Sequence, residues 1–252
     1  MKTTRLFVAA AILALGAGAA FAALPAHISK SLADSGRPAA DTGRDANRHP
    51  GELLAFAGVR PGMKVVDLFP GGGYYTRIFA QAVGPKGQVY AYIGNNADAR
   101  LKSQGKDPDN QMADFKATYR NLGVIHGPLS GFITPEPVDI VWTSDNYHDF
   151  HNGATGVADT ATMNKGIFNS LKHGGIYLVL DHRAPKGAGM DATNKLHRMD
   201  EEIAKQEIEA AGFKLVGESK ILANPSDDNS KRVFEAGEHD RTDQFVLKFR
   251  KP

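Results

Sequence analysis

The most informative residues of this chain are a carboxylate and three glycines at the end of an apolar run. Asp67 lies within the run 65–68, and Gly71, Gly72 and Gly73 follow almost at once. Glycine lets the chain turn sharply and approach a ligand closely, because it has no Cβ. A helix that begins after such a turn directs free N–H groups and the positive end of its dipole into the same space. The pattern predicts a ligand site in which Asp67 accepts hydrogen bonds from hydroxyl or ammonium groups. The open alternative is a tight strand-to-helix connection that binds no ligand.

A second set of reactive side chains follows another apolar run, residues 138–143. Asp145, His148 and Asp149 come directly after it, and His182 closes a later apolar run. An imidazole takes up or releases a proton near neutral pH, and a neighbouring carboxylate can orient it. We predict His148, Asp149 and His182 as catalytic residues. The open alternative is that these side chains cap the next helix or bond to loop backbone.

Other chemistries find less support in the sequence. Side chains that suit zinc, iron or manganese are present at His148, Asp149, His151, Asp181 and His182. None of them shows a spacing as specific as His-Glu-x-x-His, so no metal site is predicted. The chain has no cysteine nucleophile, no Gly-x-Ser-x-Gly elbow and no Walker-type lysine after the glycines.

Alternating strands and helices must position these residues. We expect strands at residues 65–68, 88–93, 124–125, 138–143, 176–180, 213–222 and 244–250, and helices at 50–58, 75–83, 160–171 and 196–212. Alternation of this kind predicts a doubly wound α/β sheet, in which functional residues gather at the carboxyl ends of the strands. Residues 98–114 lack a clear period, so part of them is expected to be a loop.

On the helix expected at 196–212, His197 and Arg198 are interpreted as part of a solvated face. The alternative is that Arg198 binds a carboxylate of the substrate.

In these features the chain resembles the class I S-adenosylmethionine-dependent methyltransferases. Their first motif runs hydrophobic-hydrophobic-Asp/Glu-x-Gly-x-Gly-x-Gly. Asp67, Gly71 and Gly73 match its acid and its last two glycines, whereas Phe69 stands at the first glycine. The segments RPGMKVVDL and LKHGGIYLVLDH are similar to strands one and five of the family. The resemblance runs from Pro50 to the C-terminus, and is greatest to an exported bacterial group of predicted methyltransferases with an Asn-Tyr-His-Asp element.

The resemblance implies a Rossmann-like sheet of seven strands, mostly parallel, with an antiparallel last strand. It also implies S-adenosylmethionine as the cofactor. The predicted cofactor-binding residues are Asp67, Gly71, Gly72, Gly73, Asn95 and Asp145. Asn95 stands near the usual place of an acid for the ribose hydroxyls, and Gly127–Pro128 replaces an acid near the adenine. Each missing buried hydrogen bond costs ~1–3 kcal/mol, so weakened cofactor binding is expected.

The N-terminus has the features of an export signal. Lys2 and Arg5 precede an apolar stretch at 6–19, and Ala20-Phe21-Ala22 offers small residues for signal-peptidase cleavage. An uncleaved anchor is the competing interpretation. We expect a signal peptide at 1–22, an extension at 23–49 that packs loosely, and one methyltransferase-like domain at 50–252, located in the bacterial periplasm. No membrane insertion is expected after cleavage.

Composition excludes some partners. Cleavage of the signal would lower the formal net charge from +2 to 0, so a basic surface for nucleic acid or anionic lipid has no support. The absence of cysteine rules out disulfides. The oligomeric state is not decided by the sequence.

The sequence thus predicts methyl transfer to an oxygen or nitrogen nucleophile of a small molecule. The competing hypothesis is a non-catalytic, exported ligand-binding or envelope-interaction protein on a degenerate methyltransferase scaffold. A nicotinamide-dependent oxidoreductase fits less well, because it also needs an acid after the second strand.

Overall fold

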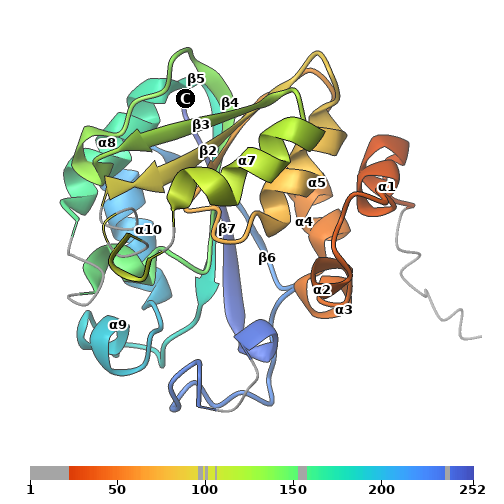
Figure 1. The fold of residues 1–252 in the computed structure, drawn as a ribbon. Helices are drawn as coiled ribbons and strands as arrows, with labels where there is room; N and C mark the ends of the chain where they lie inside the picture. Colours follow the sequence, from red (N-terminus) through yellow and green to blue (C-terminus); the bar gives the residue numbers. More distant parts are fainter. Residues whose placement is uncertain (1–22, 96–98, 100–101, 106, 153–157, 236–238) are drawn as a thin grey trace, which may run out of the picture.

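The computed structural model (Figure 1) describes residues 23–252, apart from 96–98, 100–101, 106, 153–157 and 236–238. The expected signal peptide, 1–22, lies outside these described residues. A seven-stranded sheet has the order β3-β2-β1-β4-β5-β7-β6. Its strands are β1 (Lys64–Leu68), β2 (Gln88–Gly94), β3 (Leu122–Gly127), β4 (Val138–Ser144), β5 (Leu171–His182), β6 (Lys214–Ser219) and β7 (Gln244–Arg250).

The last strand is antiparallel to both of its neighbours, and the other paired strands are parallel. The expected doubly wound α/β sheet with an antiparallel last strand is therefore confirmed. Strands β3 and β5 are longer than the apolar runs that predicted them, because sheet pairing continues into their polar residues.

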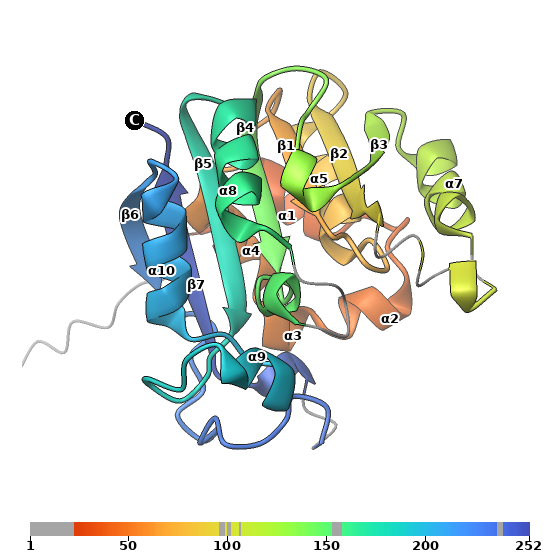
Figure 2. The ribbon, with the colours of Figure 1, turned by 90° about the vertical axis from the view of Figure 1, so that its left-hand side faces the viewer.

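Helices cover both faces of the sheet (Figure 2). On one face lie α4 (Pro50–Ala57), α5 (Tyr74–Val83) and α7 (Pro108–Thr118), and on the other lie α8 (Thr160–Ser170) and α10 (Glu201–Ala210). Because successive strand residues point to opposite faces, Val65 belongs to the core under α5 and Val66 to the core under α8 and α10. Part of the segment expected as a loop at 98–114 is helical, since α7 begins at Pro108.

The N-terminal extension is helical and well packed, so the expectation of loose packing is wrong. It contains α1 (Ala26–Leu32), α2 (Ala39–Thr42) and α3 (Asp45–Arg48). Ile28 is fully buried in the core beside α5. Arg37 forms a bidentate ion pair with Asp45, with N–O distances of 2.6 and 2.8 Å. The segment is therefore anchored both by apolar burial and by charge.

The helix expected at 196–212 is present but shorter, since α10 begins only at Glu201. A separate short helix, α9 (Asp191–Lys195), precedes the expected range. The side chain of Asp200 accepts a hydrogen bond from the N–H of Glu202 at 3.1 Å, so it caps and starts α10. The residues between the two helices, including His197 and Arg198, therefore form a loop. Helical periodicity could not predict the direction of this loop.

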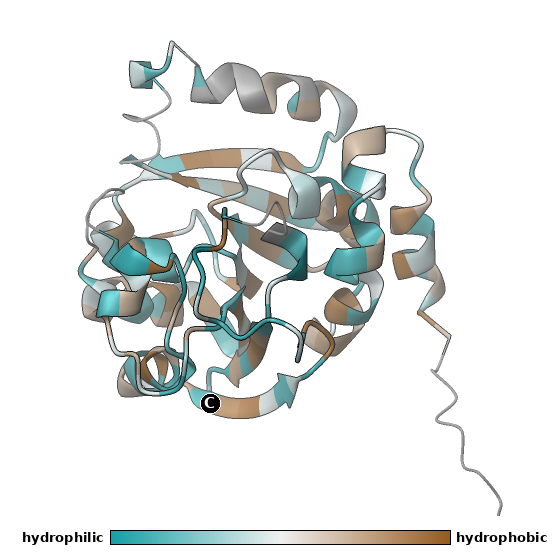
Figure 3. Cartoon of the chain, turned by 90° about the horizontal axis from the view of Figure 1, so that it is seen from below, coloured by the Kyte–Doolittle hydropathy of each residue, from teal (hydrophilic) through white to brown (hydrophobic). Residues whose placement is uncertain are grey.

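The carboxyl ends of β1, β4 and β5 meet at one edge of the sheet, toward the bottom of Figure 2. Two short helical turns lie near it, η2 (His148–His151) and η3 (His239–Arg241). Seen from this side in Figure 3, the strands are largely hydrophobic and the loops around them are largely polar. In the described part of the chain, every helix is too short or too polar to cross a membrane.

Candidate functional site

The glycine loop joins β1 to α5 and leaves open space beside its backbone. Gly71 and Gly73 have positive φ angles, 53° and 79°, which glycine adopts without strain. A Cβ added to Gly71 or Gly72 would meet no atom within 4 Å, whereas one on Gly73 would lie 2.5 Å from the Phe115 ring. The first two glycines therefore face a space that a ligand can enter, and the third allows close packing of α7.

Phe69, at the usual place of the first motif glycine, also has a positive φ of 61°. That conformation costs a residue with a Cβ roughly 1–2 kcal/mol. Its ring fills the space beside Gly94, where a Cβ would lie 2.7 Å from the ring, and makes an edge contact with Phe150 at 5.5 Å. The backbone oxygen of Phe69 accepts a hydrogen bond from Asn146 at 3.1 Å. Packing and hydrogen bonding thus offset the strain of the altered turn.

Asp67 is 3% exposed, and its carboxylate accepts a hydrogen bond from the Thr76 hydroxyl at 2.6 Å. Burial raises the pKa of Asp67 to about 6, although the Thr76 hydrogen bond and the Arg48 guanidinium act to lower it. A buried carboxylate that ionises only near neutral pH gains stability from a cationic or donating ligand. Asp67 therefore has the chemistry expected of a ligand-binding acid.

The two other residues predicted to contact a cofactor occupy different environments. Asn95 directly follows β2 and is exposed. Asp145 directly follows β4, has a positive φ of 57°, and forms an ion pair with Arg48 at 3.1 Å. Its carboxylate is therefore already engaged by a cation of the protein itself.

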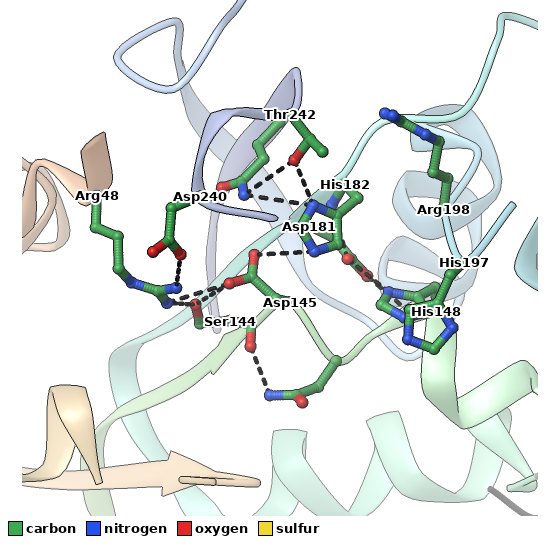
Figure 4. A network of polar contacts seen from close by, with 12 residues as sticks. Arg48, Ser144, Asp145, His148, Asp181, His182, His197, Arg198, Asp240 and Thr242 are labelled. Atoms are coloured by element: carbon green, nitrogen blue, oxygen red, sulfur yellow. Dashed lines mark hydrogen bonds and ion pairs between the residues drawn. The ribbon is translucent and has the colours of Figure 1, made fainter. Parts of the chain in front are cut away.

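Arg48 comes from α3 in the N-terminal extension and was missed by the sequence analysis. Its guanidinium donates to Ser144 at 3.0 Å and to Asp240 at 2.9 Å, in addition to the ion pair with Asp145 (Figure 4). Arg44 holds the same Asp240 carboxylate through N–O distances of 2.6 and 2.7 Å. The spacing of Arg44 and Arg48 by one helical turn was the available signal. These contacts fix the extension to the carboxyl edge of the sheet.

His148 and Asp181 form a fully buried pair. The Nδ1 atom of His148 lies 2.7 Å from one carboxylate oxygen of Asp181, and the His148 backbone N–H donates to the other oxygen at 2.7 Å. Burial acts to lower the pKa of His148, but the Asp181 carboxylate and its hydrogen bond, with Asp149 and Asp145, raise it overall. The end of β5 thus orients the imidazole that follows β4.

His182 is the second predicted catalytic histidine, and it is also fully buried. Its Nδ1 lies 2.6 Å from the hydroxyl oxygen of Thr242, and its Nε2 lies 4.0 Å from Asp145. The rings of His148 and His182 are 5.8 Å apart. The structure therefore brings the residues after β4 and β5 together, as the strand-end argument predicts.

His197 and Arg198 differ from their expected solvated face. The His197 ring lies 4.1 Å from that of His148, so it joins the site. Arg198 is 2% exposed and forms an ion pair with Asp227 at 2.9 Å. It also donates to the backbone oxygen of Lys231 at 2.9 Å. Arg198 thus stabilises the loop after β6, and the interpretation of a solvated face is wrong.

Some known proteins share sequence or fold with this chain. No family model matches the chain. A curated relative, the ubiquinone/menaquinone biosynthesis C-methyltransferase UbiE of Shewanella woodyi, is 33% identical over 136 residues, which cover 53% of this chain and 48% of the relative. The chain thus spans about half the length of this relative.

Solved structures resemble the chain more completely. An S-adenosylmethionine-dependent methyltransferase from Aquifex aeolicus has a TM-score of 0.53 and 17% identity, over 89% of this chain and 98% of that one. The cyclase SpnF has a TM-score of 0.56 and 14% identity, over 89% of this chain and 91% of that one. At these identities the likeness concerns the fold.

Proposed function

Since the chain has the fold of the class I S-adenosylmethionine-dependent methyltransferases, we propose that it transfers a methyl group from S-adenosylmethionine to a small molecule. The observation that carries this proposal is the loop after β1. There Asp67, buried near the end of β1 and with its pKa raised to about 6, precedes a loop in which the backbone of Gly71 and Gly72 is open.

The cofactor-binding residues follow from that loop. The carboxylate of Asp67 would accept hydrogen bonds from the ammonium group of the cofactor, and the backbone from Gly71 to Gly73 would lie against its amino-acid end. Asn95, exposed at the end of β2, would bond a ribose hydroxyl without adding a charge. Asp145, which follows β4 and is paired with Arg48, would also contact the cofactor.

The acceptor is proposed to be an oxygen or nitrogen nucleophile. In the transfer a lone pair of the acceptor attacks the methyl carbon, and the bond from that carbon to sulfur breaks. The sulfonium then becomes the neutral thioether of S-adenosylhomocysteine, and the acceptor proton needs a base. His148 or His182, with Asp149 nearby, would supply that function at the strand ends. A carbon acceptor, as in the name of the Shewanella relative, is the competing class.

The cellular location is proposed from the sequence alone. Lys2, Arg5 and the apolar stretch at 6–19 support export to the bacterial periplasm with cleavage after Ala22. Fractionation of the producing cells, with mass spectrometry of the N-terminus, tests this. An intact N-terminus on a cytoplasmic chain would contradict it.

Calorimetric titration with S-adenosylmethionine and S-adenosylhomocysteine tests the proposed function. We expect binding by the wild type that is lost or strongly weakened in Asp67→Ala. Asp159→Ala is a matched control, because Asp159 is an exposed carboxylate that caps α8. Absence of binding up to millimolar ligand would refute the methyltransferase and leave the exported ligand-binding protein. Equal binding by wild type and Asp67→Ala would show that the cofactor site is elsewhere.

A further inference from the structure

Three side chains at the carboxyl edge form a cluster that the proposed methyl transfer does not fully explain. His148, Asp149 and His197 each offer one nitrogen or oxygen atom, and these atoms all lie within 4.8 Å of one another. We propose that the cluster binds a divalent first-row transition metal ion, such as zinc. The catalytic role of the ion rests on the proposed function, whereas its binding does not.

The orientation of His148 is the first argument. Asp181 contributes only acceptor oxygens, so the Nδ1 atom of His148, 2.7 Å away, must donate. With Nδ1 donating to Asp181, Nε2 is the ring nitrogen at which a metal ion can take the place of a proton. This Nε2 is buried and makes no hydrogen bond. A carboxylate behind a histidine fixes the ring and makes the opposite nitrogen a better metal ligand.

The distances between the ligand atoms are the second argument. The Nε2 of His148 lies 3.4 Å from an oxygen of Asp149, and the Nε2 of His197 lies 3.6 Å from the same oxygen. Ligands about 2.0–2.1 Å from a tetrahedral zinc ion lie about 3.4 Å from each other. The contacts of 3.4 and 3.6 Å are long for hydrogen bonds. A metal ion placed between the three atoms would form coordination bonds to them instead.

Access and donor type are the third argument. The side chains of Asp149 and His197 are 18% and 17% exposed, whereas that of His148 is 0% exposed. The cluster therefore opens on one side, where an ion can enter and water or an acceptor can complete the coordination. Two imidazoles and one carboxylate suit zinc, iron or manganese better than magnesium or calcium. The amide nitrogen of Asn152, 3.4 Å from Nδ1 of His197, steadies that ring from behind.

A second cluster nearby, of Asp145, Asp181 and His182, is less suited to a metal ion. Both oxygens of Asp181 already accept hydrogen bonds, from His148 and from the backbone N–H of His182. Asp145 is neutralised by Arg48 at 3.1 Å. These interactions leave Asp181 as the partner that positions His148, and the proposed ion would lie on the side of that ring nearer His197 (Figure 4).

A bound cation would sharpen the proposed chemistry. It would lower the pKa of an acceptor hydroxyl that coordinates it, and it favours an acceptor with neighbouring oxygens that can chelate. His148 would then act as a ligand, and His182 would remain to accept the proton. With a metal ion in the site, the proposed methyl acceptor is therefore a small molecule whose nucleophile is an oxygen atom.

Cobalt(II) titration of chelator-treated protein, purified without a histidine tag, tests the site. We expect one cobalt per chain with visible absorption bands of a coordinated ion, displaced by zinc. His197→Ala and Asp149→Asn should each weaken binding by about 100-fold or more, and Asp181→Asn by about 10–100-fold. His173→Ala is the matched control, because His173 is exposed near the opposite end of β5 and should bind as the wild type does.

Two outcomes would overturn the proposal. One is the absence of cobalt bands up to millimolar metal. The other is unchanged affinity in His197→Ala and Asp149→Asn, which change partly exposed positions and should still fold, as a thermal melt can check. Cofactor titration of the same samples separates the two proposals. Metal binding without cofactor binding would refute the methyltransferase alone, and cofactor binding without metal binding would refute the ion alone.

Discussion

Replacement of Asp67 by asparagine should stabilise the ligand-free protein above pH 6. The carboxylate is buried, and its pKa is raised from the ordinary value of 3.8 to about 6. At about 1.4 kcal/mol per pH unit, ionised Asp67 opposes folding by about 3 kcal/mol. Asparagine keeps the shape and can still accept the hydrogen bond from Thr76, but it has no charge to bury.

The sign of the pH dependence follows from proton binding. Between pH 3.8 and about 6 the folded protein holds the Asp67 proton more tightly than the unfolded chain does. The free energy of unfolding of the wild type therefore falls as the pH rises through this window, and the loss from this group is complete above it. The difference between Asp67→Asn and wild type should be near zero at pH 4 and approach about 3 kcal/mol above pH 6.5.

Urea denaturation of both proteins at several pH values measures this difference. Asp159→Asn serves as a control, because Asp159 is exposed and the hydroxyl of Thr162 lowers its pKa, so this variant should gain no stability above pH 6. The cofactor should show the opposite preference. Its ammonium group needs the ionised carboxylate, so affinity in the wild type should fall about tenfold per pH unit below 6. A stability difference that is negative, or that does not change between pH 4 and 7, would refute this account of Asp67.

Four further substitutions test other parts of the structure. Gly73→Ala should lower the stability measured in urea, because its Cβ would lie 2.5 Å from the Phe115 ring. Gly72→Ala should change stability by less than about 0.5 kcal/mol, but it should weaken cofactor binding at least tenfold. Equal stability of the two variants would contradict the different roles of these glycines. Arg48→Met should lower the free energy of unfolding by about 3–5 kcal/mol in the same assay, because two carboxylates lose a buried counter-ion. A loss below about 1 kcal/mol would show that charge does not anchor the extension. Asp200→Ala should cost about 1 kcal/mol through the lost cap of α10, and an unchanged denaturation midpoint would contradict that role.

Some residues of the site could be predicted because their signals are local. The carboxylate and glycines after β1 are adjacent in sequence, and turn and helix geometry fix where they point. His148 and His182 follow two parallel strands, and such strand ends meet at one edge of a sheet. A local signal was overlooked at Asp200, where a capping residue followed by acidic residues marks the start of α10 and would have removed His197 from the expected helix.

Other residues could not be placed in this way, because their partners are remote in sequence. Arg48 is buried against Asp145 and Asp240, which lie 97 and 192 residues further along the chain. No periodicity or spacing links these positions, and a polar N-terminal segment is compatible with loose packing until its partners are known. The contribution of the extension to the site could therefore be recognised only from the folded structure.

By itself, the sequence determined the doubly wound sheet, the glycine loop with Asp67, and the edge at which the reactive side chains collect, since hydrophobic period and turn chemistry act over short distances. The tertiary structure alone decided how those side chains pair. It directed Asp181 toward His148 rather than toward solvent, brought His197 beside His148 and Asp149, and buried Arg48 against Asp145. Charge and coordination depend on distances of a few ångströms between remote residues, and only the packed fold sets those distances.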